Sequence, residues 1–165
     1  MYRFKRFLYR SDRPVLSALC VALLYPVVMM FVLGALCSLL SAFLPYDIVF
    51  PTGTALFKGL PVWFNILKTL LLMPVIEELF FRFLLYDYVL KRIFGLPVKY
   101  AAPVSALIFG LCHRNIYQGL FCFIAGLYLA FLYDRRQSPA LPILFHVTSN
   151  SSALLFELFL AGIMR

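Results

Sequence analysis

The sequence predicts an all-α fold, a polytopic transmembrane helical bundle of about five membrane segments. The first reason is composition: 64% of the residues are hydrophobic, 13% are charged and the mean hydropathy is +0.93, whereas ordinary soluble domains carry about 25% charged residues. The second reason is pattern, because the apolar stretches have helical lengths and lack the alternation that strands show. We therefore expect an integral membrane protein whose partner is the lipid bilayer, with no nucleic acid bound despite a net charge of +8.

The first membrane segment is expected at residues 15–44, as an N-terminal anchor span with a kink at Pro26. Its apolar stretch is too long for the 7–15-residue apolar region of a signal peptide. Five basic residues crowd the segment before it: Arg3, Lys5, Arg6, Arg10 and Arg13. Basic residues flanking a span favour the cytoplasmic side and contact anionic lipid. We expect a cell (inner or cytoplasmic) membrane protein with its N-terminus in the cytoplasm.

The remaining chain divides into four further apolar segments separated by short turns. With about 20 residues needed per span, the length leaves no room for a soluble domain, so residues 1–165 are expected to form one membrane domain. The turns at 91–99 and 134–136 are basic and are expected in the cytoplasm. The turn at 45–57 has no lysine or arginine before Phe57 and is expected on the opposite side.

Two adjacent acidic residues, Glu77 and Glu78, stand in the middle of the second apolar segment. Ionisable groups at membrane depth are costly, about 2.5–3.5 kcal/mol on insertion scales, and usually serve a function. Arg82 lies four residues after Glu78, on the same helical face. The pair could be a structural ion pair that locks the helix, whereas Glu77 has no obvious partner on its own helix.

Other polar residues recur at the same spacing on later segments. His146 and Asn150 lie four apart, as do Phe109 and His113, and the chain has no third histidine. A carboxylate can accept a proton from water, while imidazole and amide groups can hydrogen-bond a developing oxyanion. This is a set typical of a hydrolase. Two histidines and one glutamate (His113, His146 and Glu77) are also plausible zinc ligands, although the spacing does not match H-E-x-x-H.

Three blocks in order, Glu77-Glu78-x-x-x-Arg82, Phe109-x-x-x-His113 and His146-x-x-x-Asn150, resemble the motifs of the CAAX protease and bacteriocin-processing (CPBP, or Abi) family of intramembrane proteases. The resemblance covers about residues 60–160 as a catalytic core. It implies a metal-free, glutamate-type endopeptidase that cleaves near the membrane-embedded or C-terminal end of a membrane-anchored protein or peptide substrate. It further implies that Glu77 activates water with His113, that His146 and Asn150 stabilise the oxyanion, and that Arg82 holds Glu78.

Two other functions fit parts of the same pattern. A non-catalytic membrane chaperone or bacteriocin-immunity protein could retain the fold, although it need not keep every motif residue intact. A proton-coupled transporter could also use carboxylates and histidines, but we find no internal repeat. The four cysteines, Cys20, Cys37, Cys112 and Cys122, lie in apolar surroundings and are expected to be buried structural thiols.

Overall fold

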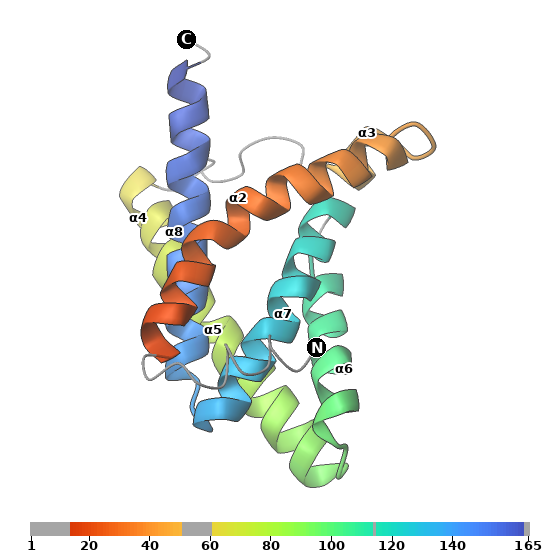
Figure 1. The fold of residues 1–165 in the computed structure, drawn as a ribbon, viewed down its shortest axis with the longest axis vertical. Coiled ribbons are helices and arrows are strands. Elements are labelled where there is room, and N and C mark those ends of the chain that lie inside the picture. The colour runs from red at the N-terminus through yellow and green to blue at the C-terminus, as the bar shows by residue number, and fades with distance from the viewer. Residues whose placement is uncertain (1–13, 51–60, 114, 164–165) are drawn as a thin grey trace.

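The computed structural model describes residues 14–50, 61–113 and 115–163, and no strand occurs among them (Figure 1). The helices are α2 (Pro14–Leu40), α3 (Tyr46–Val49), α4 (Val62–Leu67), η2 (Lys68–Leu72), α5 (Met73–Glu78), η3 (Leu79–Ile93), α6 (Val98–Leu111), α7 (Ile116–Arg136) and α8 (Ala140–Ile163). The prediction of an all-α bundle is confirmed. The first part of the turn expected at 45–57 forms α3, and the rest of it, from residue 51 on, lies outside the described residues.

Two of the described helices are long and apolar enough to cross a membrane, at Val15–Leu40 and Ile116–Arg136. The first corresponds to the expected anchor span; it contains Pro26 and bends along its length (Figure 1). Large apolar side chains such as Leu24 and Phe31 lie exposed on its outer face. In a membrane protein such faces contact lipid tails, so exposure of this kind needs no covering protein.

The second apolar segment forms one continuous helical run from Val62 to Ile93, which is widened in two places into π-helix. At the first of these, the N–H of Met73 bonds the carbonyl of Lys68, five residues back. In this register the next donor would be residue 74, which is a proline and has no N–H. The carbonyl of Thr69 is therefore left without that backbone donor, about two helical turns before the adjacent glutamates.

Helices α6 and α7 form a tight antiparallel hairpin because small residues face each other across it (Figure 1). A Cβ atom on Gly110 would lie 2.7 Å from the backbone oxygen of Gly119, and one on Gly126 would lie 3.0 Å from the Cβ of Ala106. Neither approach leaves room for a larger side chain. The side chain of Asn115 caps the start of α7 by accepting a hydrogen bond from the N–H of Gln118 at 2.8 Å, as N-cap residues do.

The two basic turns lie at the same end of the bundle. Lys91, at the end of η3, contacts the carboxylate of Asp134, at the end of α7, at 2.7 Å. Val15, near the start of α2, shares a groove with Arg136. The structure therefore agrees with the alternating path that the sequence predicts, while the membrane side of this end stays a prediction.

Candidate active site

The carboxylate of Glu78 and the guanidinium of Arg82 form an ion pair in the interior. Nε of Arg82 lies 3.1 Å from Oε2 of Glu78, and both side chains are 0% exposed. The contact is not aligned as a hydrogen bond, and the two terminal guanidinium nitrogens have no hydrogen-bond partner among the described residues. The guanidinium carbon lies 4.8 Å from the ring centre of Phe109, within the range of a cation–π contact.

His146 connects the two adjacent glutamates. Its Nδ1 donates to Oε1 of Glu78 at 3.0 Å, because a carboxylate only accepts. Its Nε2 lies 3.6 Å from Oε2 of Glu77. The Glu77 side chain is 23% exposed, whereas that of Glu78 is 0% exposed, so of the two only Glu77 is accessible to an incoming molecule.

His113 lies at the tip of the α6–α7 hairpin with both ring nitrogens engaged. Its Nδ1 is 2.9 Å from the carbonyl oxygen of Phe109, one turn earlier on α6. Its Nε2 is 3.2 Å from the Sγ atom of Cys122 on α7. His113 also interacts electrostatically with Glu77, so the hairpin brings this imidazole to the same region as the glutamates.

Asn150 lies one turn after His146 on α8 and also reaches the Val62–Ile93 run. Its Nδ2 donates to the carbonyl oxygen of Thr69 at 3.2 Å. In the π-helical register the donor to the Thr69 carbonyl would be residue 74, but Pro74 has no N–H. The side-chain amide of Asn150 supplies the missing donor to this backbone carbonyl. The widened helix thus fixes the orientation of Asn150.

The ring of Phe109 packs at the centre of the predicted site residues and is 1% exposed. It makes edge contacts with both imidazoles, with ring centres 5.2 Å from His113 and 5.9 Å from His146. Its face covers the guanidinium of Arg82. In the sequence Phe109 is notable only for its spacing from His113, and its central position could not be predicted from that spacing.

The structure brings five of the six predicted residues into direct or shared contact: Glu77, Glu78, Arg82, His113 and His146. Asn150, the sixth, lies one turn after His146 on α8 and binds the same Val62–Ile93 run at Thr69. Arg114, which follows His113, lies outside the described residues. The sequence did not point to Cys122, Thr69 or Pro74 as site residues. Cys122 contacts His113 only because two helices pack together. Thr69 and Pro74 matter because the π-helix leaves the Thr69 carbonyl without a backbone donor.

The expectation that all four cysteines are buried is wrong for two of them. Cys37 and Cys122 are buried, but Cys20 and Cys112 are exposed. Apolar neighbours in the sequence of a membrane protein can mean lipid as well as protein, so they do not by themselves indicate burial. Cys122 is also more than a packing residue, because its sulfur contacts His113.

The positions of the donor atoms can be compared with the alternative zinc ligands. Among the described residues no group of three His, Cys, Asp or Glu side chains is arranged to hold a metal ion. Nε2 of His113 faces Cys122, while Nδ1 of His146 faces the carboxylate that also pairs with Arg82. Of the alternative ligand set of Glu77, His113 and His146, Nε2 of His146 lies beside the Glu77 carboxylate, whereas Nε2 of His113 lies beside Cys122.

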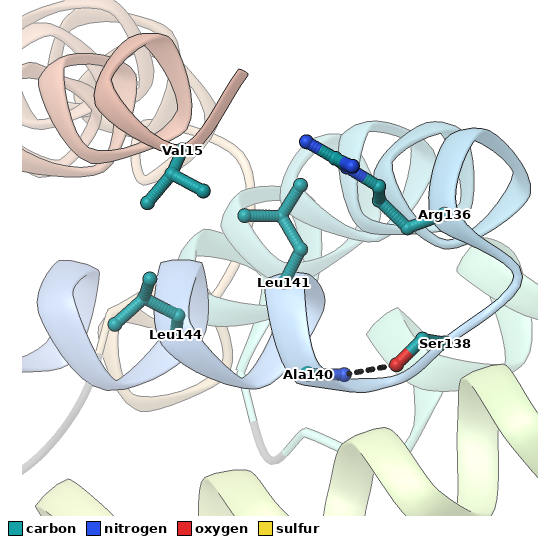
Figure 2. A pocket seen from close by; sticks show the side chains of 6 residues that line it. All are labelled: Val15, Arg136, Ser138, Ala140, Leu141 and Leu144. Carbon is teal, nitrogen blue, oxygen red and sulfur yellow. Dashed lines mark hydrogen bonds between the residues drawn. The ribbon is translucent and has the colours of Figure 1, made fainter. Parts of the chain in front are cut away.

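A shallow groove of about 310 Å³ lies away from these residues, where the start of α2 meets the end of α7 and the start of α8 (Figure 2). Its lining consists of Val15, Arg136, Ser138, Ala140, Leu141 and Leu144. None of the predicted site residues faces it. The groove is thus separate from the polar cluster in the middle of the bundle.

Comparison with known proteins identifies the family of this chain. The family model described as "Type II CAAX prenyl endopeptidase Rce1-like" matches residues 59–152, more than half of the chain and a range that includes all six predicted site residues. The chain is also 27% identical over 85 residues to "Putative membrane peptidase YdiL" of Bacillus subtilis (strain 168). That match covers 52% of this chain and 34% of the relative. No solved structure gives a significant match. The chain belongs to the Rce1-like family of type II CAAX prenyl endopeptidases.

Proposed function

We propose that this protein is an intramembrane endopeptidase that hydrolyses a peptide bond near the membrane-embedded or C-terminal end of a protein substrate. The observation that carries the proposal is the contrast between two adjacent glutamates. Glu78 is fully buried and already engaged by Arg82 and His146, whereas Glu77 is partly exposed beside His146 Nε2. Such a division gives one carboxylate to structure and leaves the other for chemistry.

Glu77 is proposed as the general base. A water molecule next to its open carboxylate edge would lose a proton to Glu77 as the oxygen attacks the scissile carbonyl carbon. His113 is proposed to orient that water. The carbonyl of Phe109 can only accept, so Nδ1 of His113 carries the proton and Nε2 is left as an acceptor for a water O–H.

His146 and Asn150 are proposed to stabilise the oxyanion that forms on the substrate carbonyl oxygen. Nδ1 of His146 already donates to Glu78, so donation from Nε2 as well requires the imidazolium form. Glu77 and Glu78 supply two negative charges next to Arg82 and this imidazolium, which makes the cluster neutral as a whole. One N–H of Asn150 holds Thr69, and its second N–H is the one available to the substrate.

The reaction is proposed to be metal-free. The described donors do not converge on one point, and each step above uses only proton transfer and hydrogen bonding by side chains of this chain. A water molecule, Glu77 and the oxyanion donors would be sufficient for a glutamate-type hydrolysis.

The substrate is proposed to be a membrane-anchored protein or peptide, which would reach the site within the bilayer. Support comes from the membrane segments and from the family, whose description names prenyl endopeptidases. The chain spans about one third of the length of YdiL, so the substrate need not be the same. We further propose that the end with the basic turns, including the N-terminus, is cytoplasmic.

The test compares the C-termini of membrane proteins in cells that express wild-type protein or Glu77→Gln. New or trimmed termini should appear with the wild type only. Glu157→Gln is the matched control, because Glu157 is an exposed acidic residue on the distal part of α8, and this variant should behave as wild type. Identical termini in all three strains would contradict the proposal.

A second arm separates an enzyme from a binding scaffold. Replacement of one oxyanion donor costs about 10²–10³ in turnover, so His146→Ala and Asn150→Ala should still co-purify with the uncleaved substrate identified in the first arm. If a double variant supports full biological function in cells, hydrolysis is not the role of this protein, and the chaperone or immunity function is favoured.

A further inference from the structure

We propose that Cys122 is a positioning residue for His113: its thiol donates to Nε2 and so fixes the tautomer and the orientation of the imidazole. The inference deepens the proposed function, since it concerns the histidine that orients the attacking water. It assigns a role to a side chain that the three sequence blocks do not contain.

The hydrogen-bond directions follow from the atoms involved. The Phe109 carbonyl at 2.9 Å can only accept, so Nδ1 of His113 is the protonated nitrogen. In the neutral ring Nε2 is then an acceptor. The sulfur of Cys122 lies 3.2 Å from Nε2, and a thiol can donate its single proton to it. Phe109 and Cys122 therefore select the same tautomer from opposite sides of the ring.

The helix hairpin imposes this contact. Gly110 and Gly119 bring the backbones of α6 and α7 together just below the turn, and Asn115 fixes where α7 begins. Cys122 follows about two turns into α7 and is 8% exposed. Because Cys122 is buried between the two helices, its sulfur lies beside Nε2 in the resting protein. Rotation of the Cys122 side chain about its Cα–Cβ bond would then expose Nε2 to the water molecule in the proposed reaction.

A thiol suits this position because it is a weak donor. It can hold the ring in the absence of substrate and yet release Nε2 to a water molecule at little cost. A hydroxyl would hold the same tautomer but compete more strongly with the water. With a methyl group, the Phe109 carbonyl alone would select the tautomer. The Nε2 side would be unrestrained, so the ring could rotate away from that carbonyl and populate the other tautomer.

The test uses the fact that the chain has two histidines, His113 and His146. Protein labelled with ¹⁵N-histidine gives signals from two rings, and a His146→Gln sample assigns them. In Cys122→Ala the ring nitrogen signals of His113 should shift away from the single Nδ1–H tautomer, while in Cys122→Ser the tautomer should be kept. Cys112→Ala is the matched control, because Cys112 precedes His113 in the sequence but is exposed, and it should leave the ring signals unchanged.

Turnover of the substrate identified above provides a second readout. Cys122→Ala should lower kcat about three- to tenfold, which corresponds to the loss of one hydrogen bond, with KM unchanged. Cys122→Ser should recover part of that loss. Unchanged His113 signals in Cys122→Ala would overturn the proposal. Loss of all activity in both Cys122 variants, with His113 signals unchanged, would also overturn it, because that result would indicate that the thiol is a nucleophile. The spectra do not depend on cleavage, so a failure of the proposed function would be recognised separately.

Discussion

Removing the charge of Glu78 provides the most demanding test of the buried ion pair. In Glu78→Gln the amide oxygen can still accept from Nδ1 of His146, so the substitution mainly removes the counter-ion of Arg82. Arg82 is 0% exposed and has no other carboxylate within ion-pair distance among the described residues. Breaking a buried pair from one side costs about 3–5 kcal/mol. For a chain of this size that corresponds to a decrease in Tm of between about 6 and 20 °C.

Glu77→Gln is the matched comparison, one residue away. Its side chain is partly exposed, and its contact with His146 is longer, at 3.6 Å, so the change in the free energy of unfolding should stay below about 1 kcal/mol. Cleavage should nevertheless be abolished. A double variant, Glu78→Gln with Arg82→Met, should recover much of the lost stability, because replacing both members of a buried pair by groups of similar size is often neutral.

The assay is thermal unfolding of the purified variants in detergent micelles, followed by circular dichroism, together with cleavage of the identified substrate. Two results would refute the reasoning. One is a Glu78→Gln protein that unfolds at the wild-type temperature, and the other is a Glu77→Gln protein that is the less stable of the two. The two results together would mean that the structural and chemical roles of the two glutamates are reversed.

Three further predictions concern the membrane topology, the widened helix and metal. Single cysteines at Asp47 and Lys99, in a cysteine-free background, should react with impermeant reagents from opposite sides of the membrane; labelling from one side would contradict the alternating path. Pro74→Ala restores a backbone N–H that competes with Asn150 for the Thr69 carbonyl, so Asn150 should lose its anchor. We expect kcat to fall by up to about tenfold, which corresponds to the loss of one hydrogen bond, without a decrease in Tm. Unchanged kcat would refute this role of the proline. Activity should survive exhaustive chelation, and loss of activity that zinc restores would refute a metal-free mechanism.

The sequence was sufficient to predict the helical class and the pairing of Glu78 with Arg82. Both depend on local rules: apolar runs of helical length, and a four-residue spacing that places two side chains on one face. The separation of Glu77 from Glu78 was also predictable, since only Glu78 has a partner at that spacing.

Contacts between helices could not be predicted in the same way. The bond from His146 to Glu78 joins residues 68 positions apart, and that from Asn150 to Thr69 joins residues 81 apart. The second also depends on a five-residue hydrogen-bond register that propensities do not reveal. The thiol of Cys122 meets His113 because glycines bring two helices together, and no spacing rule connects them.

The close approach of α6 and α7 bears on how a substrate enters. With backbone against backbone at Gly110 and Gly119, the hairpin is expected to move as one rigid body that carries His113 and Cys122. The glutamates, Arg82 and His146 belong to other helices, and the rings or charges of Arg82 and His146 contact the hairpin at Phe109. Admission of a substrate segment between these two bodies would separate the water-orienting imidazole from the base. Cleavage is then expected only after the bundle has closed around its substrate, which would protect other helices in the same membrane from accidental hydrolysis.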